Sequence, residues 1–232
     1  MKALCFFIGI NIMALAVALS KLSTLGTSPI AAIPNVLSES FSRSIGETTI
    51  FFMVFLVVLQ LLIQLPRKAT DLFLLLSQLI PGVLFGSLIN AYVSMLKPLI
   101  HWHSYALQLL TLLLSILILA IGVVIEVASD FIVMPGEGLP KTIAKTYQLA
   151  FPNVKLFCDI NMVLVALILS FAFGHPFLGI REGILLATFL TGPLVSLIVY
   201  SQNRITKKIS LRQTSILTIT KAELLSMEAL LF

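Results

Sequence analysis

The chain has 232 residues, of which 59% are hydrophobic and only 11% are charged. This composition, together with a mean hydropathy of +1.08, lies outside the usual range of a soluble globular domain and predicts a membrane protein. The net charge of +5 does not indicate nucleic-acid binding, because the basic residues are scattered over short loops and a tail instead of gathering on one face.

Six stretches are long and apolar enough to cross a bilayer as α-helices, since about 20 apolar residues span a hydrocarbon core of roughly 30 Å. Two long connections, 21–48 and 129–155, follow the first and the fourth of these stretches. The predicted spans are 3–20, 49–65, 72–95, 104–128, 156–174 and 177–200.

The basic residues divide unevenly between the two sides of the membrane. Eleven fall on one side, and only four fall on the other, namely Lys21, Arg43, Lys97 and Arg181. The positive-inside rule then predicts that both termini are cytoplasmic. We expect a multi-pass protein of the bacterial cytoplasmic (inner) membrane, surrounded by membrane lipid.

The two halves of the chain share landmarks when residues 1–90 are laid over 111–200 without gaps. Each half contains three spans, an odd number, so the second half would enter the membrane from the opposite face. The sequence therefore predicts an all-α membrane protein of two inverted three-span repeats, 1–100 and 101–200, followed by a cytoplasmic tail, 201–232. The landmarks pair as Gly26 with Gly136, Phe41 with Phe151, Pro66 with Pro176 and Gly82 with Gly192.

Each long connection holds an apolar segment that we expect to be a short helix, 28–38 in the first and 138–150 in the second. Ser28 is a suitable N-cap, and Gly138 can cap a helix that holds Pro140 near its start. Two interpretations stay open: the helices lie flat on the membrane surface, or they are re-entrant with their N-termini directed inward. Inward-directed N-termini would favour an anion.

Two short motifs follow the first and the fourth predicted spans. They are Leu25-Gly26-Thr27-Ser28-Pro29 and Val133-Met134-Pro135-Gly136-Glu137-Gly138. Through these motifs the chain from about Cys5 to Tyr200 resembles the YitT/YczE-type family of bacterial integral membrane proteins. The resemblance implies a membrane fold but no particular activity. We expect substrate contacts from the two motifs, at Gly26, Thr27, Ser28, Gly136, Glu137 and Gly138.

Carboxylates within or beside the spans are functional candidates, because a charged side chain that faces lipid is costly. Glu126 and Asp130 are four residues apart at the end of the fourth span, and Asp159 lies about one turn inside the fifth. We expect these three residues to form one ion-coupling cluster that binds a proton or a cation. The alternative is that they lie at headgroup level and pair with nearby lysines.

The common signatures of catalysis are missing from the sequence, including a Gly-rich phosphate loop, a His-Glu-x-x-His motif and a nucleophile elbow. We therefore expect no enzyme, no cofactor and no metal site. The predicted function is a secondary transporter or permease for a small polar solute, with an anionic solute favoured, bound between the two repeats. A passive channel and a non-transporting accessory or regulatory subunit are the alternatives, and assembly into a homo-oligomer is left open.

Reporter fusions test the predicted topology. We expect alkaline phosphatase to be active when fused within 97–104 and inactive when fused within 65–71, and a fluorescent protein fused to the C-terminus to fold in the cytoplasm. An external C-terminus, or an odd number of spans, would contradict both the topology and the inverted repeat.

Overall fold

The computed structural model describes residues 2–64, 69–100, 104–129, 131–173 and 181–198. The chain divides into two compact units, Met1–Val195 and Ser196–Phe232. Of the second unit, only residues 196–198 are described, so the predicted tail 201–232 lies outside the described residues.

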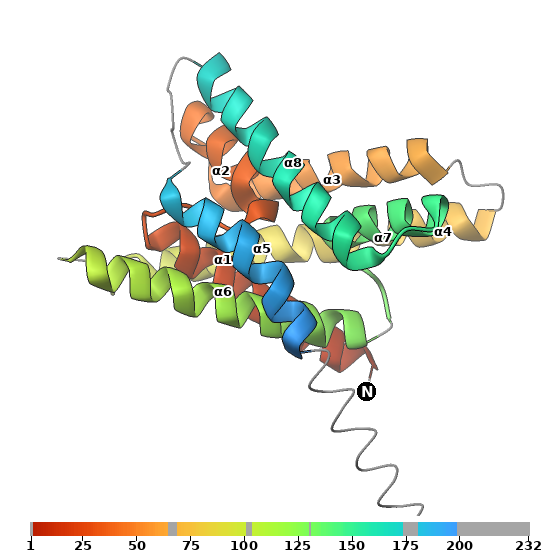
Figure 1. Ribbon diagram of the computed structural model, residues 1–232, viewed down its shortest axis with the longest axis horizontal. Helices are drawn as coiled ribbons and strands as arrows, with labels where there is room; N and C mark the ends of the chain where they lie inside the picture. The colour runs from red at the N-terminus through yellow and green to blue at the C-terminus, as the bar shows by residue number, and fades with distance from the viewer. Residues whose placement is uncertain (1, 65–68, 101–103, 130, 174–180, 199–232) are drawn as a thin grey trace, which may run out of the picture. The chain divides into compact units, whose positions relative to one another are not determined.

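The described residues are helical and contain no β-strand. Figure 1 labels eight of the helices, and a further helix covers Glu182–Ile198. The labelled helices are α1 (Lys2–Leu22), α2 (Pro29–Phe41), α3 (Ile45–Gln64), α4 (Ala69–Ser77), α5 (Leu79–Leu96), α6 (Tyr105–Ala128), α7 (Pro135–Tyr147) and α8 (Phe151–Ala172).

Five helical stretches are long and apolar enough to cross a membrane. Their outer faces carry many exposed large apolar side chains, such as Phe51, which is 75% exposed, and such faces suit lipid better than water. The chain is an α-helical multi-pass membrane protein. The predicted sixth span, 177–200, corresponds to the shorter apolar helix Glu182–Ile198 and to residues outside the described part. The five stretches are Lys2–Leu22, Ile45–Gln64, Asp71–Leu96, Tyr105–Ala128 and Asn153–Ala172.

The core of the first unit contains α1, which lies along α6 (Figure 1). Glycines allow this close approach: a Cβ atom on Gly9 would lie 2.8 Å from the backbone nitrogen of Glu126, and one on Gly122 would lie 2.6 Å from Cγ of Met13. Small residues commonly bring helices together in membranes, where apolar burial alone gives no driving force. The close packing of α1 on α6 fixes the position of Glu126.

The two short helices, α2 and α7, are inserted among the spans and each packs against both α3 and α8. Residues 29–36 and 135–140 are buried without exception, whereas the ends of both helices are exposed, at Phe41 and Tyr147. Buried starts agree with the re-entrant alternative and not with helices whose starts lie open on the membrane surface. The start predicted for the first helix, beside Ser28, agrees with the structure.

The second short helix begins earlier than predicted, at Pro135 instead of residue 138. Met134 is the N-cap residue, and Gly138 lies in the first turn, so Gly138 does not cap the helix. Pro135 is the start signal because proline at the first helical position has no N–H group that needs a partner. Pro140 lies inside the helix, as Pro34 does in α2.

Corresponding features of the two short helices are 106 residues apart, one helical turn less than the predicted offset of 110. Gly26 is therefore not equivalent to Gly136. Gly26 adopts a positive φ of 125° in the turn before α2, whereas Gly136 belongs to the first turn of α7. The features at this spacing are Pro29 and Pro135, Pro34 and Pro140, and the left-handed C-cap residues Ser42 and Gln148.

Helix packing predicts opposite effects for two Gly→Ala substitutions. A Cβ atom on Gly46 would lie 2.1 Å from the backbone oxygen of Gly86, whereas one on Gly192 would meet no atom within 4 Å. We expect Gly46→Ala to destabilise the protein by about 1–3 kcal/mol and Gly192→Ala to stabilise it by about 0.5–1 kcal/mol through helix propensity. Thermal unfolding of the purified protein in detergent measures both, and an equal effect at the two positions would contradict this packing.

Candidate functional site

The starts of α2 and α7 contact one another inside the first unit. A Cβ atom on Gly136 would lie only 1.8 Å from Cδ1 of Ile30, so the Ile30 side chain occupies the space that the glycine leaves. Ile30 belongs to the first turn of α2, and Gly136 belongs to the first turn of α7. The two helix N-termini therefore meet, and their partial positive charges lie in one region of the buried core.

The start of α2 carries two hydroxyl groups without partners. Thr27 is 0% exposed and Ser28 is 3% exposed, and neither hydroxyl oxygen has a hydrogen-bond partner in the described part of the chain. Ser28 has the extended backbone of an N-cap residue, but its side chain makes no capping bond. An unpaired buried polar group costs about 1–3 kcal/mol. A polar ligand that formed hydrogen bonds with these two hydroxyls would remove this cost.

Gly26 serves the backbone more than a ligand. A Cβ atom there would lie 3.0 Å from the backbone nitrogen of Ile184, and the nearby Gly183 N–H donates a 2.9 Å hydrogen bond to the oxygen of Leu25. The turn before α2 is therefore pressed against the start of the helix Glu182–Ile198.

The start of α7 is capped by a carboxylate from another helix. Oε1 of Glu126, on α6, accepts a 2.9 Å hydrogen bond from the backbone N–H of Met134. Glu126 is buried, and its second oxygen, Oε2, has no partner among the described residues. A negative side chain at a helix N-terminus is stabilised by the helix dipole and by the free N–H groups, so α6 and α7 are joined by this contact.

A second acidic group, Glu137 in the first turn of α7, is held by a lysine. Lys155 Nζ lies 3.1 Å from Oε1 of Glu137 and donates a 2.9 Å hydrogen bond to Oδ1 of Asp159. The Lys155 side chain is only 12% exposed. Burial raises the pKa of the Glu137 carboxyl group above its usual value, and the neighbouring Lys155 partly opposes this shift. Lys155 joins α8 to α7.

The predicted ion-coupling cluster is only partly reproduced by these contacts. Glu126 and Asp159 are both buried beside α7, but Asp159 pairs with Lys155 and Glu126 bonds to the N–H of Met134. Asp130 lies outside the described residues. The pairing of Asp159 with Lys155 agrees instead with the alternative in which the carboxylates pair with nearby lysines. The spacing of Lys155 and Asp159, four residues apart on one helix face, is the sequence signal that could have identified the pair.

Gly136 and Gly138 make room for neighbouring side chains. Gly138 faces the amides of Gln60 and Gln78, since a Cβ atom there would lie 2.6 Å from Oε1 of Gln78. These two amides are hydrogen-bonded to each other, and Nε2 of Gln60 also donates to the oxygen of Pro135 at 3.3 Å. The amide pair holds the first turn of α7 against α3.

The groups at this site suit hydrogen bonding and proton binding. Within the described ranges, no group of three or more His, Cys, Asp or Glu residues is placed to hold a metal ion. The available groups are two hydroxyls, two carboxylate oxygens and helix N–H groups, which can bind a polar molecule.

A family model described as a family of unknown function (DUF6198) matches residues 1–200. The chain belongs to this family. The matched residues of this DUF6198 member include α1 to α8, and with them the candidate site. Comparisons with curated proteins and with solved structures give no significant match. The resemblance to YitT/YczE-type proteins is a finer assignment, on which the family match is silent.

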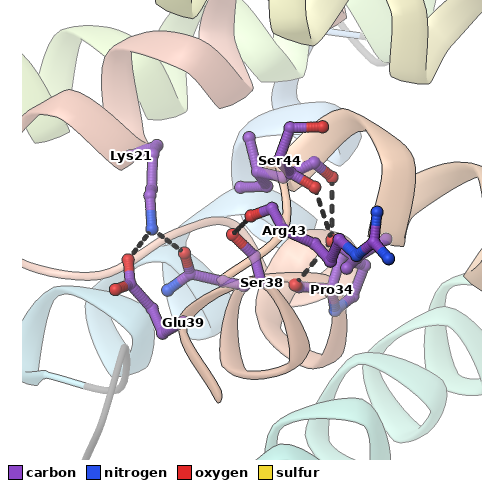
Figure 2. Close-up of polar contacts among 9 residues, drawn as sticks. Lys21, Pro34, Ser38, Glu39, Arg43 and Ser44 are labelled. Carbon is purple, nitrogen blue, oxygen red and sulfur yellow. Dashed lines mark hydrogen bonds and ion pairs between the residues drawn. The ribbon is translucent and has the colours of Figure 1, made fainter. Parts of the chain in front are cut away.

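The DUF6198 chain also has a polar cavity of about 620 Å³ at the far end of α2. Figure 2 shows part of its wall, where Lys21 contacts Asn35 and Glu39, and Ser38 donates a 2.9 Å hydrogen bond to the oxygen of Arg43. This cavity was not predicted, because its residues come from four separate helix ends. Its lining residues are Lys21, Ser38, Glu39, Ser42, Arg43, Ser44, Ile45, Glu47, Asn90, Val93 and Ser94.

Removing the lysine tests the ion pair. We expect Lys155→Met to destabilise this DUF6198 member by about 3–5 kcal/mol at neutral pH, because Glu137 and Asp159 then lose their cation. The control Lys145→Met, at an exposed position on α7, should change stability by less than about 0.5 kcal/mol. Unfolding in detergent provides the measurement, and equal stability of the two variants would contradict the ion pair.

The same variant should respond to pH. Because burial raises the pKa of Glu137 in the folded protein, the folded state holds this proton more tightly than the unfolded chain does. The contribution of Glu137 to stability is then greatest at low pH and falls as pH rises above the ordinary carboxyl value of 4.5. We expect this fall to extend to higher pH in Lys155→Met than in the unchanged protein, because Lys155 no longer opposes the shift.

Proposed function

We propose that this protein is a secondary transporter or permease for a small polar solute, which binds at the starts of α2 and α7. The position of the unpartnered buried polar atoms carries this proposal. Of the five such atoms in the described structure, four belong to the two helix starts and to the residue that caps α7: Thr27 Oγ1, Ser28 Oγ, Glu126 Oε2 and Glu137 Oε2. Buried groups that lack partners in the protein fit a molecule that binds transiently.

The two helix starts differ in the groups that they would offer to a solute. The start of α2 offers hydroxyls and helix N–H groups, which favour an acceptor or an anionic group. The start of α7 offers the carboxyl oxygens of Glu126 and Glu137, which favour a hydrogen-bond donor. A solute with both kinds of group fits the pair of helices better than a simple anion, which suits α2 alone.

We also propose that the two halves are inverted repeats that rock against each other around this site. The 106-residue spacing supports the repeat, because backbone hydrogen bonds recur at the same spacing. Ser23 N–H donates to Leu19 O as Ser129 N–H donates to Ile125 O, and Arg43 N–H donates to Ser38 O as Leu149 N–H donates to Ala144 O. The stretches Lys2–Leu22, Ile45–Gln64 and Asp71–Leu96 precede α6, and an odd number of spans inverts the second half.

We propose that the protein lies in the bacterial inner membrane with both termini in the cytoplasm. Lys155 contacts Glu137 and Asp159 inside the bundle, so it no longer counts as a loop charge. Ten basic residues against four still favour cytoplasmic termini. The polar cavity at the exposed end of α2 would give a solute an entry from one face.

Transport is tested after the solute is found from the metabolite difference between deletion and overexpressing cells. We expect Thr27→Val and Ser28→Ala each to lower uptake into proteoliposomes about tenfold, which corresponds to the loss of one hydrogen bond of about 1.4 kcal/mol. Ser40→Ala is a matched control, because Ser40 also has an unpartnered hydroxyl but lies about 18 Å from Ser28 along the axis of α2. It should keep full uptake.

The same assay separates the other classes of function. Wild-type uptake by both Thr27→Val and Ser28→Ala would show that the solute does not bind at the start of α2. Flux that never exceeds the equilibrium distribution of the solute would indicate a passive channel. A complete absence of solute differences between the two cell types would indicate an accessory or regulatory subunit.

A further inference from the structure

The start of α7 holds more negative than positive side chains. Glu126, Glu137 and Asp159 are each 2% exposed, and Lys155 is the basic group that contacts two of them. Three ionised carboxylates beside one ammonium group would leave uncompensated negative charge away from water, which is strongly unfavourable. A buried group in this position usually takes up a proton instead.

The contacts show which carboxylates are left without compensation. Lys155 contacts Asp159 at 2.9 Å and Oε1 of Glu137 at 3.1 Å, so one ammonium group faces two carboxylates. Oε1 of Glu126 is bonded to the N–H of Met134. The remaining oxygens, Oε2 of Glu126 and Oε2 of Glu137, are buried and have no partner in the described part of the chain.

These two oxygens belong to residues that are linked through Met134, the N-cap residue of α7. Met134 donates its N–H to Glu126, and its own oxygen accepts a 3.0 Å hydrogen bond from the N–H of Glu137. Both carboxyl groups therefore lie at the first turn of the same helix. Like charges at such a place disfavour ionisation of both groups together.

The other neighbours do not supply a second full compensation. The charged neighbours of Glu126 include Lys141 and Lys155, and those of Glu137 are Lys155 and Asp159. The Lys141 side chain is exposed, so water screens its charge. From α1, Gly9 packs against Glu126, and from α3, the neutral amide of Gln60 contacts α7. A metal ion is disfavoured, because no three ligand residues converge in the described ranges.

We propose that Glu126 and Glu137 together bind one exchangeable proton at the start of α7, while Lys155 and Asp159 remain a fixed ion pair. Binding forms an O–H bond on a carboxylate oxygen and neutralises one negative charge, and release returns the proton to water. An ionised Glu126 caps Met134 with a charge-assisted hydrogen bond, which is roughly twice as strong as a neutral one. Proton release therefore tightens α7 against α6, and proton uptake loosens it.

This inference deepens the proposed function by naming the proton as the coupling ion, but its test needs no solute. Infrared difference spectra of the purified protein in lipid nanodiscs, recorded in KCl, follow the carbonyl stretch of protonated carboxyl groups. We expect one protonated carboxyl group to persist above about pH 6, beyond the ordinary carboxyl range. Glu126→Gln and Glu137→Gln should each shift or remove this titration by about one pH unit or more.

Two further variants make the result specific. Glu47→Gln, at the polar cavity beside the other end of α2, should leave the titration unchanged. Lys155→Met should move it to higher pH, because the positive charge of Lys155 favours the ionised form of the Glu137 carboxyl group that it contacts. Thermal unfolding of each variant shows that the fold is retained.

Defined outcomes overturn the proposal. It is wrong if all carboxyl groups of the unchanged protein titrate within the ordinary range of about pH 4–5, or if both Gln variants keep the high-pH titration. It is also wrong if replacing KCl with NaCl abolishes the titration, which would indicate a bound sodium ion. A proton site combined with normal uptake by Thr27→Val and Ser28→Ala would sustain this inference and refute the proposed solute site.

Discussion

The first backbone N–H groups of α2 and α7 have no partner within their own helix, and lipid hydrocarbon offers no hydrogen-bond acceptor. The arrangement of the site follows from this constraint. Proline at the first position of each helix removes one donor. In α7 the carboxylate of Glu126 takes the N–H of Met134. In α2 the backbone oxygen of Ser28 accepts from Ala31 at 2.9 Å, and the Ser28 hydroxyl is left unused.

The two short helices share their proline positions and C-cap conformation but differ in the charged side chains around them. At the 106-residue spacing, Glu126, Glu137, Lys155 and Asp159 correspond to Ser20, Ala31, Thr49 and Met53, all of which are uncharged. The charged set therefore is not needed to insert a short helix among the spans. The charges of this set lie at one of the two helix starts only.

Hydropathy was sufficient to predict five of the six spans, and Ser28 with Pro29 was sufficient to predict the start of α2. The start of α7 was missed because two proline signals, Pro135 and Pro140, compete in the sequence and only the packing of Gly136 against Ile30 distinguishes them. The roles of Lys155 and of the Gln60–Gln78 pair depend on contacts between distant segments, which no local pattern encodes. The polar cavity has the same origin, since its walls come from several helix ends.

The packing of α2 on α8 also has a consequence for biosynthesis. Helix α2 ends at Phe41, and α8 begins at Phe151, so about 110 residues must be synthesised after α2 before its later partner exists. During that time α2 has only part of its final surroundings, because its packing on α3 can form early but its packing on α8 cannot. Its 13 residues are too few to cross the hydrocarbon core alone, so the short helix reaches its final surroundings only after translation of the second half.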